Sequence, residues 1–182
     1  MRIGILKETT REEKRVALAP SGVTALVATG HIVFVESNAG YESHFFDDEY
    51  RKAGANIVYN KEEIFQRSEM ILKVAPINET EAALFEENQI VFSFLHLAVS
   101  KKNILEMFLK KKITTISYEL IEKKGQLPAL WTMGEITGQL AIQLGERFLQ
   151  SNFIESRGIL MGGVTGVAPA AVVIIGAGNV GF

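Results

Sequence analysis

In Ala171-Val-Val-Ile-Ile-Gly-Ala-Gly-Asn-Val-Gly181, an apolar and mostly β-branched run leads directly into glycines spaced as G-x-G-x-x-G. This order predicts a buried strand over residues 171–175, followed by a tight turn and a helix. Gly176 would make the turn, Gly178 would let the backbone approach a pyrophosphate, and Gly181 would let the helix pack on the strand. The stretch therefore indicates an α/β fold and the opening of a dinucleotide-binding Rossmann unit.

Upstream of that stretch, short apolar runs alternate with helical patterns. Strands are expected over residues 2–8, 32–36, 56–59, 70–74, 89–94 and 113–117. Helices are expected from Pro20 to a stop at Gly30, and over residues 47–53, 61–66, 80–85 and 101–111. Strands that alternate with helices form βα units on a mostly parallel sheet, so we expect a second Rossmann-like sheet here.

One segment, residues 133–149, has a different pattern. Its apolar side chains recur every four residues, at Ile136, Leu140, Leu144 and Phe148. This spacing gives one apolar stripe along a long helix. We expect the helix to connect two α/β units, with domain one over residues 1–130 and domain two, the connecting helix and the first strand of a truncated Rossmann domain, over residues 131–182.

The composition excludes several classes of protein. The 182 residues carry a net charge of −2, whereas nucleic-acid binding usually needs a strongly basic face. There are no cysteines, and the three histidines are too scattered for a zinc site, so no metal is expected. The chain has no signal peptide pattern and no apolar stretch near about 18 residues, so we expect no membrane span and a cytoplasmic location.

Six short motifs follow one another along the chain. They are Met1-Arg-Ile-Gly-Ile-Leu-Lys-Glu8, Arg15-Val-Ala-Leu-Ala-Pro20, Ile71-Leu-Lys-Val74, Phe92-Ser-Phe-Leu-His-Leu-Ala98, Ser117-Tyr-Glu119 and Gly158-Ile-Leu-Met-Gly-Gly-Val-Thr-Gly166. In this order they resemble the alanine dehydrogenase and proton-translocating transhydrogenase family over essentially the whole chain. Phe94-Leu-His-Leu-Ala98 and Leu160-Met-Gly-Gly163 look like the dehydrogenase branch, because the transhydrogenase branch lacks the histidine at the position of His96.

The resemblance implies an activity and an architecture. Members of the dehydrogenase branch carry out the reversible oxidative deamination of L-alanine to pyruvate and ammonia with NAD. Their active site lies in a cleft between a substrate domain, here residues 1–130, and an NAD-binding domain, and they are commonly homo-oligomers. The chain is expected to be the N-terminal part of such an enzyme. Because the helix after Gly181 and the family's catalytic aspartate would lie further on, we expect this chain alone to bind NAD poorly and to have little or no activity.

Three residues match family positions with chemical roles. Arg15 matches the arginine that binds the substrate carboxylate, a task that suits the planar guanidinium fork. Lys73 matches the lysine that contacts the substrate's carboxylate or carbonyl oxygen, and His96 matches the general acid and base. Without the resemblance, a solvated arginine and a structural histidine would be the better interpretations of Arg15 and His96. Lys73 would be either a site residue at the carboxyl end of a strand or a lysine at a core edge. Tyr118 and Glu119 are given a supporting or a structural role.

The family's cofactor contacts map onto two segments of this chain. Met133 and Gly134 match the position where the connecting segment touches the cofactor, and Gly176, Gly178 and Gly181 form the fingerprint. Many members have serine where this chain has Gly134, so a hydroxyl contact to phosphate is lost. The loop after Lys73 also departs from the family pattern, because Val-Ala-Pro-Ile replaces Val-Lys-Glu-Pro.

Two other functions stay open at the level of sequence. One is a transhydrogenase subunit that binds a nucleotide without oxidising an amino acid, against which His96 argues. The other is a non-catalytic α/β module that only oligomerises or binds a partner. Hydride exchange between two nicotinamide cofactors would identify the first, and association without any turnover would identify the second.

Overall fold

The computed structural model describes residues 1–150 and 158–181. It contains two compact units, Met1–Leu120 and Ile121–Phe182, which are treated separately below. The domain boundary expected after residue 130 stays a prediction.

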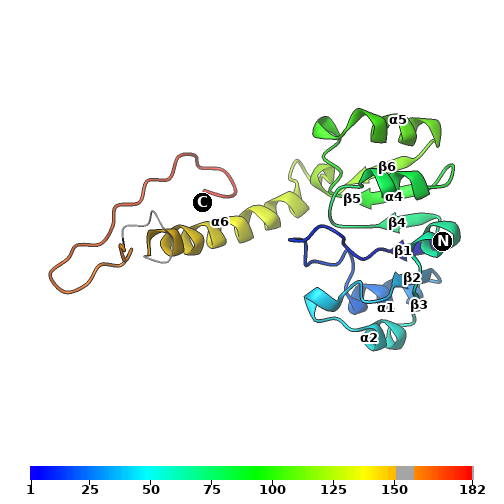
Figure 1. The fold of residues 1–182 in the computed structure, drawn as a ribbon, viewed down its shortest axis with the longest axis horizontal. Helices are drawn as coiled ribbons and strands as arrows, with labels where there is room; N and C mark the ends of the chain where they lie inside the picture. Colours follow the sequence, from blue (N-terminus) through cyan, green and yellow to red (C-terminus); the bar gives the residue numbers. More distant parts are fainter. Residues whose placement is uncertain (151–157, 182) are drawn as a thin grey trace. The chain divides into compact units, whose positions relative to one another are not determined.

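The first unit is built on a six-stranded sheet in which every pairing is parallel (Figure 1). The strands lie in the order β3-β2-β1-β4-β5-β6. Their bounds are β1 (Arg2–Ile5), β2 (Ile32–Glu36), β3 (Asn56–Val58), β4 (Met70–Leu72), β5 (Ile90–Ser93) and β6 (Thr114–Ser117). The α/β class and the Rossmann-like parallel sheet are therefore confirmed.

A helix follows each of the first five strands. The helices are α1 (Pro20–Ala28), α2 (Asp47–Lys52), α3 (Lys61–Arg67), α4 (Glu79–Leu84) and α5 (Lys102–Lys110). Three short 3₁₀ turns are η1 (Tyr41–Ser43), η2 (Leu97–Val99) and η3 (Tyr118–Leu120). Local sequence explains several helix starts, since Pro20 opens α1 and the Asn60 side chain accepts the Glu62 N–H at the start of α3.

The core lies in two layers, one on each face of this sheet. One layer joins strand residues to α3, α4 and α5 and includes Phe34, Ile64, Phe65, Ile71, Ala82, Val91 and Phe108. The other joins strand residues to α1 and α2 and includes Ile3, Ile5, Val23, Val33, Val35 and Tyr50. Because both faces are covered, the strands are apolar on both sides, which is typical of parallel sheets.

The strand order determines where a ligand can bind. From β1, the chain first builds β2 and β3 on one side and then returns to build β4, β5 and β6 on the other. The connections therefore diverge between β1 and β4, and the carboxyl ends of these two strands flank the switch point. Open parallel sheets bind ligands at this place, because the loops on either side leave a crevice there.

The second unit contains the long helix α6 (Pro128–Leu149), which confirms the expected long helix, while its role as a connector between two domains stays a prediction. It begins five residues earlier than the apolar spacing suggested, because Pro128 occupies the first turn, where its missing N–H costs nothing. The four side chains of the apolar stripe are exposed along α6.

The expected buried strand over residues 171–175 is wrong for this structure. No strand is formed there, and the Ile175 side chain is 97% exposed. A buried parallel strand needs a neighbour for its backbone N–H and C=O groups, and none of the described strands pairs with this segment. Without such a neighbour, the apolar run stays exposed. None of the helices in the described ranges is long and apolar enough to cross a membrane.

Candidate active site

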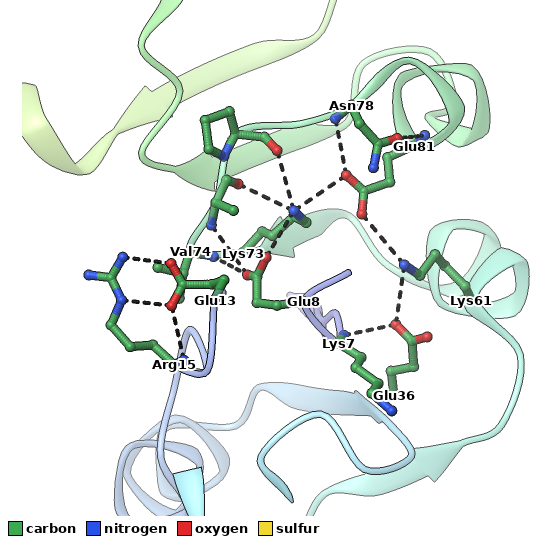
Figure 2. A network of polar contacts seen from close by, with 12 residues as sticks. Lys7, Glu8, Glu13, Arg15, Glu36, Lys61, Lys73, Val74, Asn78 and Glu81 are labelled. Atoms are coloured by element: carbon green, nitrogen blue, oxygen red, sulfur yellow. Dashed lines mark hydrogen bonds and ion pairs between the residues drawn. The ribbon is translucent and has the colours of Figure 1, made fainter. Parts of the chain in front are cut away.

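Lys73 lies immediately after β4, and its side chain is only 1% exposed. Its ammonium nitrogen lies 2.9 Å from Glu8 Oε2 and 3.5 Å from Glu81 Oε2. It also donates to the carbonyl oxygens of Pro76 and Ala75, at 3.3 and 3.5 Å (Figure 2). The buried positive charge is thus paired with two carboxylates, as a buried ion requires.

Glu8 joins the two strands that flank the switch point. It follows β1 along the chain, and its Oε1 accepts the Val74 N–H at 2.6 Å just beyond β4. The Lys73 N–H donates to the Phe92 carbonyl at 3.1 Å, which continues the pairing between β4 and β5 past the last regular residue. Glu8 and Lys73 are therefore held by three neighbouring strands at the carboxyl edge of the sheet.

Glu81 is positioned by the start of α4. The Glu81 N–H donates to Asn78 Oδ1 at 2.9 Å, and the Asn78 N–H donates to Glu81 Oε2 at 3.1 Å, which makes a capping box. The other carboxylate oxygen lies 3.5 Å from Lys61 Nζ, which lies 3.9 Å from Glu36 Oε2. Burial raises the pKa of the Glu36 carboxyl, although a hydrogen bond from the Lys7 N–H acts in the opposite direction. A chain of alternating charges therefore extends from Lys73 toward β2.

Arg15 lies in the loop between β1 and α1, and its side chain is about half exposed. Its Nε donates to Glu13 Oε1 at 2.8 Å and its Nη2 to Glu13 Oε2 at 2.7 Å. This hydrogen bonding lowers the pKa of Glu13 and raises the pKa of Arg15. The guanidinium also lies 5.8 Å from the centroid of the Phe94 ring. The loop after β1 thus contacts the segment that follows β5, through Arg15 and Phe94.

His96 follows β5 with a left-handed backbone, at φ +46°. Its N–H donates to Glu119 Oε1 at 2.8 Å, and its Nδ1 lies 3.7 Å from the same oxygen. Glu119 Oε2 is buried and has no hydrogen-bond partner among the described residues. The imidazole is about half exposed. Left-handed backbone is uncommon for a residue other than glycine, so Glu119 holds His96 in a conformation that needs support.

Tyr118, directly after β6, packs against Phe92 of β5 and against Phe94, just beyond β5. Its ring stacks on Phe92 with centroids 4.2 Å apart and lies 5.1 Å from Phe94. Burial raises the pKa of Tyr118 to about 12, and the charge of Glu8 adds to the effect. The Tyr118 hydroxyl therefore stays neutral near the buried carboxylate, and its ring forms part of the wall between β5 and β6.

The structure brings the sequence-predicted residues of the first unit to one edge of the sheet. Lys73 and His96 follow β4 and β5, and Arg15 reaches the same edge from the loop after β1. Their chemical roles stay predictions. Sequence reasoning missed the carboxylates that pair with the cations, Glu8, Glu13 and Glu81. Only Glu81 had a readable signal, because Asn78-Glu-Thr-Glu81 fits the spacing of a capping box.

In the second unit, the glycine turn lies against α6. A Cβ at Gly134 would lie 2.9 Å from the Cβ of Asn179, and one at Gly138 would overlap the carbonyl oxygen of Val180. Gly134 is buried on this contact, and Met133 precedes it on the same helix. The two segments expected to touch the cofactor, residues 133–134 and 176–181, are therefore neighbours within this unit.

The turn itself has the backbone that the fingerprint predicts. Gly176 has φ +111°, a value that side chains rarely allow, and a Cβ at Gly181 would overlap the Gly176 carbonyl oxygen. Gly178 faces open space, with no atom within 4 Å of a Cβ built there. These features fit a loop that a phosphate can approach closely, although neither the strand before it nor a helix after it is formed among the described residues.

Comparison with known proteins identifies two family domains. Residues 4–137 match the alanine dehydrogenase/PNT N-terminal domain, and residues 141–182 match the corresponding C-terminal domain. Among curated relatives, the alanine dehydrogenases of Methanococcus maripaludis and Staphylococcus epidermidis are 45% and 43% identical over the whole chain. The chain spans about half the length of these relatives, 48% in both cases.

Solved structures give the same result. An L-alanine dehydrogenase superposes with a TM-score of 0.91 at 41% identity, over all of this chain and 50% of that one. A transhydrogenase from Sinorhizobium meliloti shares the fold, with a TM-score of 0.71 at 24% identity, over 81% of this chain and 45% of that one. From the family models, the relatives and the shared fold, this chain belongs to the alanine dehydrogenase/PNT family.

Proposed function

We propose that this chain supplies the substrate-binding part of an NAD-dependent alanine dehydrogenase. The reaction converts L-alanine, NAD⁺ and water to pyruvate, ammonium, NADH and a proton, and it is reversible. The observation that carries the proposal is the meeting of Arg15, Lys73 and His96 at the carboxyl edge of the sheet, beside the switch point between β1 and β4. Relatives named alanine dehydrogenase, at 45% and 43% identity, support the choice of activity.

The two cations would hold the substrate's oxygens. The Arg15 guanidinium already forms a two-pronged contact with a carboxylate, which is the geometry that an amino or 2-oxo acid needs. The ammonium of Lys73, fixed by Glu8 and Glu81, would face negative charge that develops on the carbonyl oxygen. Lys73 is buried, so substrate would have to replace one of its present contacts.

His96 would move the protons. Its imidazole is about half exposed at the same edge, so it can reach a substrate. The hydrogen bond from the His96 N–H to Glu119 holds the backbone that carries the ring in place. During deamination the ring would take a proton from the attacking water and return one to the departing amine. A positioned imidazole suits both transfers near neutral pH.

The cofactor is a nicotinamide nucleotide, which the dehydrogenase family implies, and we propose that it is NAD. When bound, it accepts the hydride from the substrate's α-carbon. Gly176, Gly178 and Gly181 would receive its pyrophosphate, because Gly176 makes the tight turn with its positive φ and the open space beside Gly178 lets a phosphate approach the backbone. Met133 and Gly134 would lie beside it on α6. A homo-oligomeric assembly and a cytoplasmic location also stay predictions.

A chimaeric enzyme tests this function. Residues 1–182 of this chain would be joined to the remaining part of the Methanococcus maripaludis relative, and NADH formation would be followed with L-alanine and NAD at alkaline pH. We expect turnover, and we expect His96→Ala to lower it by at least about 100-fold. The matched control is His44→Ala, since His44 is an exposed histidine that also has a positive φ, at +59°.

Three results would contradict the proposal. The first is a well-folded chimaera that forms no NADH from L-alanine. The second is hydride exchange between two nicotinamide cofactors without any oxidation of alanine, which would indicate the transhydrogenase branch. The third is an equal loss of turnover in His96→Ala and His44→Ala. The 182-residue chain by itself is expected to show little or no turnover in the same assay.

A further inference from the structure

The arginine assigned to the substrate carboxylate already holds a carboxylate of its own chain. Both Glu13 oxygens are engaged by Arg15, at 2.8 Å to Nε and 2.7 Å to Nη2 (Figure 2). The Glu13 side chain is 13% exposed, whereas that of Arg15 is 52% exposed. Glu13 therefore occupies the Nε–Nη2 edge of the guanidinium, the edge that would bind another carboxylate through two parallel hydrogen bonds.

Glu13 also lies within the electrostatic reach of the second cation. The Arg15 hydrogen bond is the largest cause of its lowered pKa, and the charge of Lys73 acts in the same direction. Arg15 and Lys73, the two positive groups assigned to the substrate, thus both attract the Glu13 carboxylate. An anionic substrate at Arg15 would experience the same pair of charges.

We propose that Glu13 is a built-in competitor for the substrate carboxylate, which occupies the Arg15 fork in the empty enzyme and leaves it when substrate binds. The inference rests on the proposed function, because it takes Arg15 as the substrate's anchor. Glu13 then sets the apparent affinity for amino and 2-oxo acids, since only the fraction of molecules with a released fork can bind.

The loop allows this exchange without moving Arg15. The Ser43 hydroxyl donates to the Lys14 carbonyl at 2.6 Å, which anchors the backbone directly before Arg15. Glu13 belongs to a tight turn, in which its N–H donates to the Thr10 carbonyl at 3.0 Å. Rotation of the Glu13 side chain away from Arg15 breaks the two fork contacts and the 3.0 Å bond from the Arg15 N–H, while the anchored backbone stays in place.

The test measures binding of pyruvate to the purified 182-residue chain by titration calorimetry. Glu13→Gln keeps the shape of the side chain but removes its charge, so we expect pyruvate to bind about 5- to 30-fold more tightly than in the wild type. Glu13→Ala is a second variant with the same expected direction. Glu12→Gln is the matched control, because Glu12 is an exposed neighbour with the same charge, and it should leave the affinity unchanged.

A second measurement follows the Arg15 Nε–H signal by nitrogen-15 NMR. In the wild type, pyruvate should shift this signal from its Glu13-bound position, and Glu13→Gln should shift it before any pyruvate is added. If wild type binds pyruvate but Glu13→Gln and Glu13→Ala bind it equally well or more weakly, the competitor role is overturned and the proposed function stands. An equal gain in Glu12→Gln also overturns it, because the effect would then be one of net charge. If none of these proteins binds pyruvate, the competitor role is overturned, whereas the proposed function is decided separately by the turnover of the chimaera.

Discussion

Replacing Lys73 by methionine should strongly destabilise the first unit, because it removes the ammonium that lies between the buried carboxylates of Glu8 and Glu81. Glu8 and Glu81 are 3% and 2% exposed at their side chains, and they lie 2.9 and 3.5 Å from Lys73 Nζ. At an effective dielectric constant of about 20, these distances correspond to attractions of about 6 and about 5 kcal/mol. Most of this attraction offsets the cost of removing three charges from water.

For the net cost of Lys73→Met in unfolding free energy, we therefore use the range typical of buried ion pairs. Loss of one partner from such a pair costs about 3–5 kcal/mol, because the other charge stays buried without compensation. Lys73→Met should lower the free energy of unfolding of the chain by that amount. Urea titrations followed by far-ultraviolet circular dichroism would measure it. Methionine retains most of the apolar stem, so the loss of packing is small.

Two controls make the result specific to the buried charges. Lys102→Met makes the same change in an exposed pair, where Lys102 lies 3.4 Å from Glu106, and should cost less than about 1 kcal/mol. The double variant with Glu8→Gln should recover part of the loss from Lys73→Met, since it removes one of the uncompensated charges. An equal and small cost for Lys73→Met and Lys102→Met would refute the reasoning.

Two further predictions concern the second unit and the tyrosine buried in the first. Gly138→Ala should displace the turn at Val180 from α6, because its Cβ would overlap the Val180 carbonyl oxygen, and amide hydrogen exchange in that turn should become faster. The control is Gly145→Ala, whose Cβ would meet no atom within 4 Å, so it should only raise helix stability, by up to about 1 kcal/mol. Burial raises the pKa of Tyr50 to about 12, above the unfolded value of 10.0, so its contribution to stability is present below pH 10.0 and is lost as the pH rises through about 12. Between those pH values, Tyr50→Phe should therefore reduce the slope of the unfolding free energy against pH by about 1.4 kcal/mol per pH unit. The control is Tyr59→Phe, at an exposed tyrosine. An unchanged slope in Tyr50→Phe, or an equal change in Tyr59→Phe, would contradict the prediction.

The elements of the first unit could be predicted from local sequence because each carries its own signal. The β-branched run over residues 32–36 forms β2 with the same bounds, and the proline at position 20 marks the start of α1. These signals depend only on neighbouring residues. The order of the strands in the sheet has no such local signal. β1 pairs with β2, the next strand along the chain, but also with β4, which is separated from it by β2 and β3.

The expected strand over residues 171–175 shows where local signals fail. Its apolar pattern correctly indicates a segment that needs burial, but burial requires partner strands. The glycines after it behave differently, because the positive φ of Gly176 and the crowding at Gly181 depend only on the turn itself. A pattern that is satisfied within a few residues therefore forms by itself, whereas a strand pattern forms only where partner strands pair with it, as they do in the first unit.

The same distinction explains which part of the candidate site could be read from sequence. Arg15, Lys73 and His96 could be named because each lies in a short motif. Glu13 lies only two residues from Arg15, but Lys73 and His96 also have partners that are remote in the chain. Glu8 contacts the segment after β4 across 66 residues, and Glu119 supports His96 across 23. The parallel sheet makes these meetings necessary, because it brings the carboxyl ends of β1, β4, β5 and β6 to one edge. Arg15 and Lys73 are then paired with the carboxylates of Glu13, Glu8 and Glu81. On the proposed function, these acidic side chains decide how available each cation is to a substrate.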